Sequence, residues 1–599
     1  MMKKNAKALL MLLATLLYLV TLPPGALSHA EGAAKEKEGT PAKKSKDKLL
    51  NVQLLGMTDF HGYLQPMNDA ANGKINSPDG PLTVGGAAYM ATHLDRLAEG
   101  HKNSIRLSVG DNFSGWPFEV AAFRDEPTIE LMNKLNVELT AAGNHEFDPS
   151  LADLTKHMMK GTCIGEKEVD SCFRDSDGKK YKGSDFTYLS ANIRDAKTGK
   201  LLLKPYTIKK IPAGKGKFIP VGFLGLTTTE TVLGTTSYQE GILTVDPLTE
   251  AADRYTKELK AKGVETIVAV VHEGGTHDGY YNSCLNPRGP VIDFAKSATP
   301  EIDAIFTGHW HGAFNCSLPD PDGNPRPVVE GSNHGRLLTE LNLWIDPKTK
   351  EPVRELTTSD NIAVTRDVPK DPEIDKLVNY WADRGRERAA EPVAKQTGDL
   401  TRARNKNGES TLANLAADAH YAAGQKVKSP AEFALTASSP LRGDLPYKKG
   451  TRPNDQDGQI LYGEQWDAQG YQNPVVVVSL TGREIDQILE EQWRPGANGT
   501  GFFPLAVSHN VSYTFDNSKP AGQKVSPEDV LINGEELNVD RTYRVAALAY
   551  LIRGSDGYQT FKQYRDPERG EVDHWAFLQY LKEQKVIEPS LGRVHQTGE

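Results

Sequence analysis

The stretch TAAGNHEFDPSL (residues 140–151) sets an amide, an imidazole and a carboxylate on a single turn. Its apolar beginning and Gly143 indicate a buried strand that ends in a sharp turn, because glycine adopts backbone angles that other residues avoid. Asn144, His145 and Asp148 follow at once. One such turn is compatible with an ordinary surface loop, so its meaning depends on whether other turns carry matching groups.

Short apolar runs alternate with polar, helix-like segments over the first half of the chain. Segments 85–99 and 246–263 have helical patterns, and Gly263 is a stop signal for the second. The apolar runs are rich in β-branched residues and end near glycine or aspartate, which is typical of buried strands. They lie at residues 49–59, 104–111, 137–144, 218–227, 265–273 and 303–310. Strand–helix alternation predicts an α/β layered domain.

The ends of five of these runs carry metal-ligand side chains. In an open α/β sheet the carboxyl ends of the strands line one crevice, so groups far apart in sequence are expected to converge. Carboxylate, amide and neutral imidazole groups suit Zn, Mn or Fe, and no thiolate is among them. Seven ligands suit two divalent metal ions that share a carboxylate, for which we expect Asp111. The seven are Asp59, His61, Asp111, Asn144, His272, His309 and His311.

Four other histidines have no comparable context. We interpret them as structural or surface residues: His101, His157, His277 and His334.

Together, D-x-H (59–61), G-D (110–111), G-N-H-E (143–146), the strand-end His272 and G-H-x-H (308–311) resemble the calcineurin-like metallophosphoesterases. Four later motifs narrow the resemblance to the secreted bacterial 5′-nucleotidase family, which includes UDP-sugar hydrolases and 2′,3′-cyclic-nucleotide phosphodiesterases. These motifs are GESTLANLAADA (408–419), PLRGDL (440–445), YQNPVVVVSLTG (471–482) and YLIRGSDGY (550–558). The resemblance covers nearly all of the chain after about residue 48.

The resemblance implies an α/β fold in two domains. A layered metallophosphoesterase β-sandwich flanked by helices is expected at residues 48–366, and a second α/β (α+β) substrate-binding domain at residues 394–599. The charged, helix-like segment at residues 367–393 is expected to connect them.

The resemblance also implies roles in the first domain. Asp59, His61, Asp111 and His311 would hold one metal ion, and Asp111, Asn144, His272 and His309 would hold the other. His145 would point at the phosphate and stabilise the charged transition state or the leaving oxygen, with Asp148 orienting it. Glu146 is predicted to be structural. Many relatives have Gln or Asn where His311 stands, which leaves the native metal open.

In the second domain the resemblance implies a nucleotide pocket. Tyr471 and Tyr550 would stack on the base, Arg442 would bind polar groups, and Asp556 would bind the ribose hydroxyls. Two further candidates are Arg402 and Arg404. The alternative for the two tyrosines is a core role. The stretch TASSPLR (436–442) departs from the family, since relatives have an Asn and glycines there, and this leaves strict nucleotide preference open.

The expected activity is a metal-dependent phosphohydrolase that removes the 5′-phosphate of nucleotides with metal-activated water. Three alternatives remain. The first is cleavage of UDP-sugars or dinucleotide pyrophosphates, the second is hydrolysis of 2′,3′-cyclic nucleotides, and the third is nucleotide binding without catalysis.

Residues 1–30 have a basic start, an apolar run and small residues before Ala30, which predicts a secretory signal peptide. The alternative, an uncleaved membrane anchor, is disfavoured because the run is shorter than the about 20 residues of a spanning helix. Residues 31–47 are predicted to be a disordered lead-in. We therefore expect a secreted protein with no stable membrane anchor, periplasmic if the source has an outer membrane.

Charge and cysteines fit export. Loss of residues 1–30 removes three lysines and no acid, changing the net charge from −9 to −12. An acidic chain is a poor candidate for a nucleic-acid polymer as partner. In an oxidising compartment four cysteines predict two disulfides with three possible pairings. Cys163–Cys172 with Cys284–Cys316 is favoured, and zinc binding by the cysteines lacks a CxxC spacing. The oligomeric state is left open.

Overall fold

The computed structural model describes residues 46–69, 71–114, 117–148, 150–232, 241–450, 455–470, 473–496 and 499–598. The predicted signal peptide, nearly all of the predicted lead-in, and Tyr471 lie outside the described residues. Within those ranges, no helix combines the length and apolar character needed to cross a bilayer.

The N-terminal part is built on two six-stranded sheets. The first has the order β16-β15-β1-β4-β5-β6, and the second β13-β14-β12-β11-β9-β8. The strands of the first are β1 (Leu50–Met57), β4 (Ser104–Ser108), β5 (Leu139–Ala141), β6 (Thr187–Leu189), β15 (Leu337–Ile345) and β16 (Thr358–Ala363). Those of the second are β8 (Tyr206–Pro212), β9 (Phe218–Thr227), β11 (Thr266–His272), β12 (Ala304–Thr307), β13 (Ala313–Pro319) and β14 (Pro325–Gly331). All six predicted runs are strands.

The two sheets pack face to face around a shared apolar core. Leu54 and Leu107 of the first sheet and Val268 and Phe306 of the second belong to one buried cluster. A Cβ at Gly56 would lie 2.7 Å from the Phe306 ring, so glycine there lets the sheets approach. Strands β1, β4 and β5 run parallel, as do β9, β11 and β12, and each set therefore ends at one edge of its sheet.

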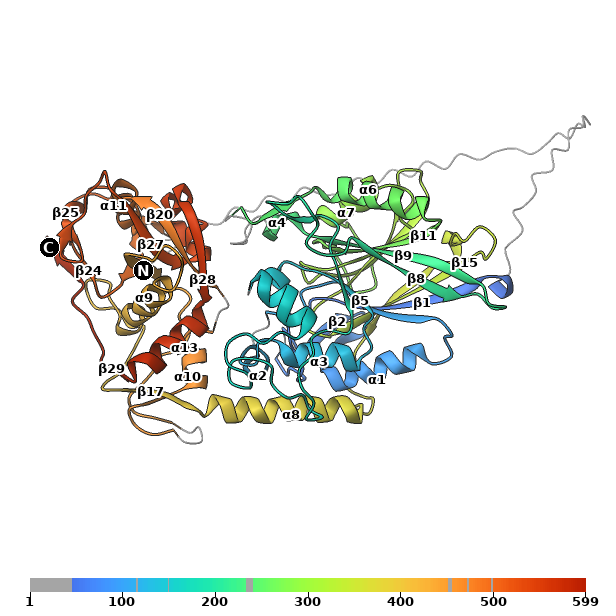
Figure 1. The fold of residues 1–599 in the computed structure, drawn as a ribbon, viewed down its shortest axis with the longest axis horizontal. Helices are drawn as coiled ribbons and strands as arrows, with labels where there is room; N and C mark the ends of the chain where they lie inside the picture. The colour runs from blue at the N-terminus through green and yellow to red at the C-terminus, as the bar shows by residue number, and fades with distance from the viewer. Residues whose placement is uncertain are drawn as a thin grey trace, which may run out of the picture. The chain divides into compact units, whose positions relative to one another are not determined.

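Helices cover the outer faces of this sandwich (Figure 1). Helices α6 (Leu248–Ala261) and α7 (Pro290–Ser297) lie on the second sheet, and α1 (Ala87–Ala98) lies on the opposite side, against β15. The apolar residues of α6 recur at helical spacing and are buried, which explains why an otherwise charged segment folds onto the sheet. They are Ala251, Ala252, Tyr255 and Leu259. The predicted sandwich flanked by helices is confirmed.

Helix α8 (Pro372–Ala389) lies within the segment predicted to connect the domains. The side chain of Asp371 accepts a hydrogen bond from the Ile374 backbone N–H at 2.8 Å and caps its start. Trp381 is buried and donates through Nε1 to Glu130 at 2.7 Å, which ties α8 to α3 (Glu126–Lys134). Helix α2 (Phe118–Ala121) also packs on α8.

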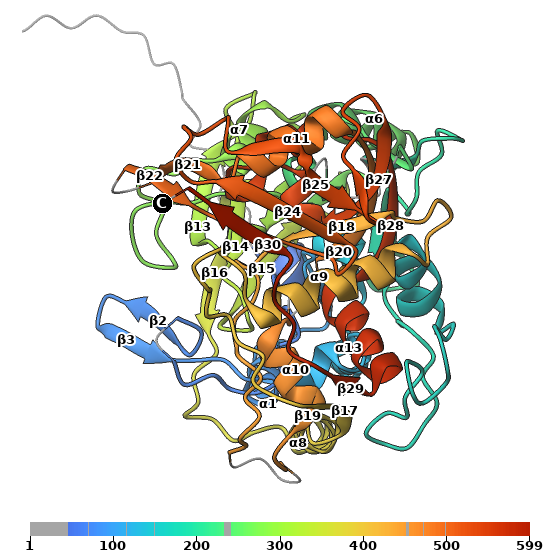
Figure 2. The same ribbon diagram turned by 90° about the vertical axis from the view of Figure 1, so that its left-hand side faces the viewer.

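The C-terminal part has a five-stranded sheet of order β23-β18-β27-β20-β28. Helices α9 and α13 lie side by side on one face of it (Figure 2). Residues of β20 alternate between two cores, with Val475 and Val477 facing α9, and Val476 and Val478 facing α11. The elements are α9 (Thr411–Gly424), β18 (Phe433–Ala437), β20 (Pro474–Thr481), α11 (Gly482–Glu490), β23 (Leu505–Val507), β27 (Thr542–Leu548), β28 (Arg565–Val572) and α13 (Asp573–Gln584). The predicted second domain of α/β type is confirmed.

A four-stranded sheet of order β26-β25-β24-β30 packs beside α11. Its strands are β24 (Val511–Asp516), β25 (Val525–Ile532), β26 (Glu535–Glu536) and β30 (Val594–Thr597). Smaller elements are β2 (Lys74–Ser77), β3 (Gly80–Thr83), β7 (Ile193–Asp195), α4 (Thr229–Val232), β10 (Leu243–Val245), β17 (Pro392–Gln396), β19 (Gln459–Leu461), α10 (Tyr462–Ala468), β21 (Trp493–Gly496), β22 (Gly499–Phe502), α12 (Ala549–Ile552) and β29 (Val586–Ile587).

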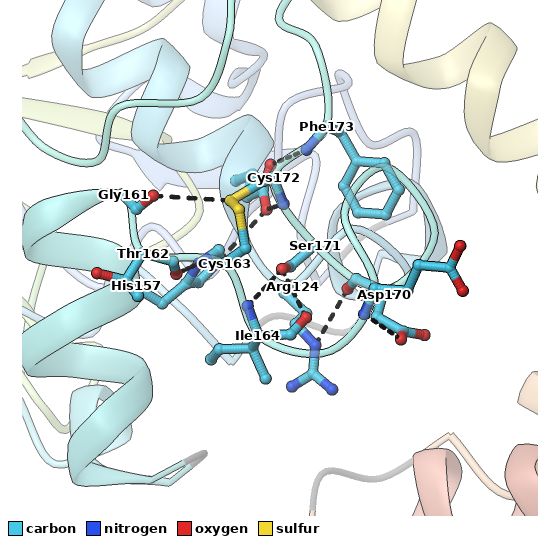
Figure 3. The surroundings of a disulfide bond; sticks show 12 residues. Arg124, His157, Gly161, Thr162, Cys163, Ile164, Asp170, Ser171, Cys172 and Phe173 are labelled. Atoms are coloured by element: carbon cyan, nitrogen blue, oxygen red, sulfur yellow. Dashed lines mark hydrogen bonds and ion pairs between the residues drawn. A yellow bond between two sulfur atoms is a disulfide. The ribbon is translucent and has the colours of Figure 1, made fainter.

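Both favoured disulfides are present, Cys163–Cys172 and Cys284–Cys316. Around the first, Figure 3 shows His157 and Gly161 next to the paired cysteines. His157 is fully buried; its Nδ1 donates to the Thr162 carbonyl at 2.9 Å and its Nε2 lies 3.3 Å from Glu126. It is therefore a structural residue, as interpreted from the sequence.

Candidate dinuclear metal site

The predicted ligands come from the ends of both sheets. Asp59 and His61 follow β1, Asp111 follows β4, and Asn144 follows β5 in the first sheet. His272 ends β11 in the second sheet, where His309 and His311 follow β12. The ligands thus come together where strand ends of two sheets meet, rather than along a single open sheet.

Six of the seven predicted ligands fall into two compact groups. Asp59, His61 and His311 form one, and Asp111, His272 and His309 form the other, with the ligand atoms of each group within 4.8 Å of one another. In the first, His61 Nε2 lies 3.3 Å from His311 Nε2, which lies 3.7 Å from Asp59 Oδ1. These separations suit donors around one cation.

Hydrogen bonds at the far nitrogens leave lone pairs directed into the groups. Nδ1 of His61 donates to the Phe113 carbonyl, and Nδ1 of His272 donates to the Val109 carbonyl, each at 3.0 Å. Nε2 of His272 faces Asp111 Oδ2 at 3.0 Å, and in the neutral ring this nitrogen carries no proton.

Asn144 carries the seventh predicted ligand atom. Its Oδ1 is buried without a hydrogen-bond partner among the described residues. Facing acceptors and an orphaned buried oxygen fit a divalent cation, which supplies the missing positive charge.

Burial keeps most of these imidazoles neutral, as metal ligation requires. It lowers the pKa of His61 to about 3 and those of His309 and His311 to about 4. His272 differs, because the charge of Asp111 outweighs burial and raises its pKa to about 9. A proton and a cation therefore compete for the position between His272 and Asp111.

The backbone of the site is strained. Five of the seven predicted ligands have positive φ angles, between 49° and 84°, a region that non-glycine residues rarely occupy. Two neighbouring glycines permit this crowding. A Cβ at Gly143 would lie 2.1 Å from Asp111 Oδ1, and one at Gly308 would lie 2.6 Å from Asp59 Oδ2. Strain of this kind collects at functional sites, where the surrounding structure holds it in place.

Glu146 links the loop that carries Asp111 to the loop that carries Asn144. Its buried carboxylate accepts hydrogen bonds from the backbone N–H groups of Asp111 at 3.0 Å, Asn112 at 3.0 Å and Gly143 at 2.7 Å. It also accepts from the Asn112 side chain at 3.2 Å. The glutamate thus fixes the loops after β4 and β5 relative to each other.

His145 and Asp148 form a hydrogen-bonded dyad beside the ligands. Nδ1 of His145 donates to Asp148, and the His145 backbone N–H donates to Asp111 Oδ1 at 2.9 Å. Burial opposes protonation of His145, but Asp148 and Asp111 outweigh it and raise its pKa to about 10. The His145 side chain is 37% exposed, so a substrate can reach it. The dyad is thus placed to hold a proton next to the two groups.

The predicted substrate residues are only partly brought together. Tyr550 and Asp556 both contact Ser439; its hydroxyl lies 2.9 Å from the Tyr550 hydroxyl and donates to Asp556 Oδ2 at 2.5 Å. Arg404 donates to Ser438 at 2.5 Å, next to this group.

The remaining three are placed differently. Arg402 pairs with Asp444 at 2.9 Å, and Arg442 is exposed. Tyr471 lies outside the described residues.

Comparison with known proteins agrees with this geometry. Residues 52–313 match the calcineurin-like phosphoesterase family, and residues 391–563 match the 5′-nucleotidase C-terminal domain, together more than half of the chain. The chain belongs to the calcineurin-like phosphoesterases with a 5′-nucleotidase C-terminal domain. The prediction of the family, and with it of a metal-dependent phosphoester hydrolase, is confirmed.

Relatives and a solved structure extend the likeness to most of the chain. A cell wall protein of Listeria monocytogenes is 27% identical, covering 92% of this chain and 69% of its own. A 5′-nucleotidase of Vibrio cholerae is 26% identical, covering 84% and 87%. Two longer relatives are spanned over less than half their length. The structure of NAD nucleotidase from Haemophilus influenzae shares the fold, with 19% identity, a TM-score of 0.55, and coverage of 92% of this chain and 100% of that one.

Calcineurin-like phosphoesterases bind two divalent metal ions, and the two groups of donors provide for both, which confirms the predicted cofactors. Asp111 is grouped with His272 and His309, and its sharing between both ions remains a prediction.

His334, interpreted from the sequence as a structural or surface residue, is buried beside the ligands. It is 7% exposed, its ring stacks on Tyr63 with centroids 3.7 Å apart, and it lies 5.9 Å from the rings of both His61 and His311. His334 follows β14, which pairs in parallel with β12, so it too stands at a strand end. The sequence does not reveal this strand end, because two prolines break the apolar pattern of β14.

A second missed group borders Asp556. The Arg494 guanidinium lies over the rings of Phe503 and Tyr558, 4.3 and 4.5 Å from their centroids. A Cβ at Gly557 would lie 2.7 Å from Arg494, so glycine next to Asp556 admits this stack.

Proposed function

We propose that this chain is a secreted 5′-nucleotidase that removes the 5′-phosphate of nucleotides with water. The observation that carries the proposal is the link between the His145–Asp148 dyad and the ligand groups through the His145 backbone and Asp111. A protein that only binds nucleotides has no need for such a dyad. The paired cysteines and the signal-like residues 1–30 support export.

Two bound divalent cations would supply the activation of water and the neutralisation of phosphoryl charge. We assign Asp59, His61 and His311 to one, and Asn144, His272 and His309 to the other, with Asp111 between them.

His145, held by Asp148 at Nδ1, presents Nε2 to the phosphate. There it donates to the phosphoryl or leaving-group oxygen, whose developing charge it stabilises.

Specificity is assigned to the C-terminal domain, which we place at residues 394–599, after a domain at 48–366 and a connecting helix at 367–393. The Tyr550 ring and the Asp556 carboxylate, joined by Ser439, offer a stacking face and an acceptor for ribose hydroxyls. Arg404 lies at the same edge. Arg442, Arg402 and Tyr471 complete the proposed set of substrate residues.

A panel of substrates tests the reaction. Purified protein with Mn²⁺ or Zn²⁺ is expected to release phosphate from AMP faster than it cleaves UDP-glucose, NAD or 2′,3′-cyclic AMP. The last of these is included because relatives in the family are 2′,3′-cyclic-nucleotide 2′-phosphodiesterase/3′-nucleotidases. A preference for a pyrophosphate or a cyclic diester would replace the proposed substrate, and no turnover with two bound cations would leave a binding protein.

Truncation of Tyr550 tests the pocket. Tyr550→Ala is expected to cost about 1–3 kcal/mol of AMP binding, the range for base–aromatic stacking, and so to raise the KM for AMP. The KM and turnover for p-nitrophenyl phosphate, which has no base, should stay nearly unchanged. Tyr550→Phe is the matched control, since it keeps the ring and loses only the bonds of the hydroxyl to Ser439 and Asp556. Asp556→Ala should separate ribose-bearing from ribose-free substrates. Equal losses on both substrates would remove this pocket from the proposal.

A further inference from the structure

The ring of His311 is held differently from the rings of His61 and His272. Those two donate through Nδ1 to backbone carbonyls, so the single proton of each neutral ring lies on Nδ1. Nδ1 of His311 instead lies 2.9 Å from the side-chain nitrogen of Asn333. An amide nitrogen only donates, so His311 Nδ1 accepts.

Arg336 fixes this orientation of the Asn333 amide. Its guanidinium, which has no acceptor, donates to Asn333 Oδ1 and is anchored by the Ala71 carbonyl at 2.7 Å. The amide nitrogen must therefore face the other way, where it also donates to His334 Nε2 at 3.2 Å. His334 Nδ1 in turn donates to Asn72 Oδ1 at 2.9 Å, which agrees with an accepting Nε2.

The consequence is that neutral His311 carries its proton on Nε2. This is the atom that lies 3.3 Å from His61 Nε2 and 3.7 Å from Asp59, in the position of a metal ligand. Binding a cation there requires the loss of that proton and the gain of one at Nδ1. The new N–H would then point at the nitrogen of Asn333, so the amide must turn and break its bond to Arg336. Asn333 is only 5% exposed, which leaves little water to replace the lost partners.

We propose that Asn333 is a positioning residue that weakens the cation site of Asp59, His61 and His311, making it the more readily exchanged of the two. The inference rests on the proposed function in taking His311 as a ligand. A ligating histidine usually donates its second N–H to an acceptor, and mutation of that acceptor typically changes metal affinity 10–100-fold. Here the group at the second nitrogen is a donor.

The test measures Zn²⁺ affinity of the metal-stripped full chain by competition with a chelator. The wild type is expected to bind two ions in separate steps. Asn333→Asp places an acceptor at His311 Nδ1 and should tighten the weaker step by about 10–100-fold. Asn72→Asp is the matched control, because it adds the same charge nearby yet contacts His334 and not His311.

The outcomes separate the inference from the proposed function. Unchanged or weaker binding in Asn333→Asp overturns the role of Asn333. Equal tightening in Asn72→Asp overturns it as well, because the added negative charge alone would then explain the effect. His311→Ala should abolish the weaker step. If that variant still binds two ions with wild-type affinity, His311 is not a ligand, and the ligand set of the proposed function is wrong.

Discussion

At the scale of single residues, the site combines chemical types that the sequence reveals with conformations that it does not. The ligand types at strand ends are visible in the sequence, and so is the strand-end glycine of the opening stretch. The left-handed backbone of five predicted ligands is not visible, because each costs about 1–3 kcal/mol that only the finished fold can offset. The polarity of the group behind each histidine is equally hidden, as Asn333 behind His311 illustrates.

Asp111 is the residue whose loss should harm the site most. Asp111→Asn removes a negative charge that faces His272 and disturbs the acceptor for the His145 backbone. We expect turnover to fall by orders of magnitude and bound metal, measured by mass spectrometry, to fall below two ions per chain. A variant that keeps two ions and near-normal activity would contradict the sharing of Asp111.

His145 should behave in the opposite way with respect to metal. His145→Ala leaves every predicted ligand in place, so both ions should remain while turnover of AMP falls by about 10²–10⁴-fold. Asp148→Asn should lose less, because it keeps a hydrogen-bonding partner for Nδ1. Metal loss in His145→Ala would move this histidine among the ligands.

At the scale of elements, Glu146 connects the loops that follow β4 and β5. Glu146→Gln turns an amide N–H₂ toward backbone N–H donors, and each buried donor left without a partner costs about 1–3 kcal/mol. We expect a lower free energy of unfolding in urea together with weaker metal binding. Glu250→Gln, at an exposed position on α6, is the matched control and should change neither. Normal metal affinity in Glu146→Gln would show that the loops hold their places without it.

The same scale shows how far sequence patterns reach. Runs with a clean apolar pattern, such as those of β9 and β11, were found because both faces of these strands are buried. Strands β13 and β14 were missed because proline and polar residues interrupt them. The pairing of β1 with β15, where Leu50 faces Ile345, joins segments almost 300 residues apart, and no local pattern encodes such a partner.

At the scale of the whole molecule, a buried ion pair connects the start of β30 to α9. Arg593, just before β30, donates to Asp418 of α9 at 2.9 and 2.7 Å and to the Val507 carbonyl at 2.7 Å. Arg593→Met removes the guanidinium that faces buried Asp418 and leaves this carboxylate only its contacts with His509, so we expect a loss of about 3–5 kcal/mol in urea unfolding. Arg483→Met is the control, since its pair with Asp540 is exposed and worth less than about 1 kcal/mol. Similar small losses in both variants would refute the fastening role.

The ligand site also links the stability of the whole chain to pH. Asp111 raises the pKa of His272 to about 9 against the effect of burial, and Asp148 raises that of His145 to about 10 in the same way. Each folded-state value exceeds the value of about 6.5 in an unfolded chain. The stabilisation from these protons is therefore complete below pH 6.5 and is lost as the pH rises through 9 and 10.

The expected result is a melting temperature that falls between pH 6.5 and pH 9.5 in protein treated with a chelator. Saturating Zn²⁺ should flatten this fall, because a cation takes the place of the proton between His272 and Asp111. His272→Gln in chelated protein should flatten it as well, since glutamine does not titrate. Scanning fluorimetry across this range makes the comparison, and an equal fall with and without Zn²⁺ would mean that the proton and the cation do not share that position.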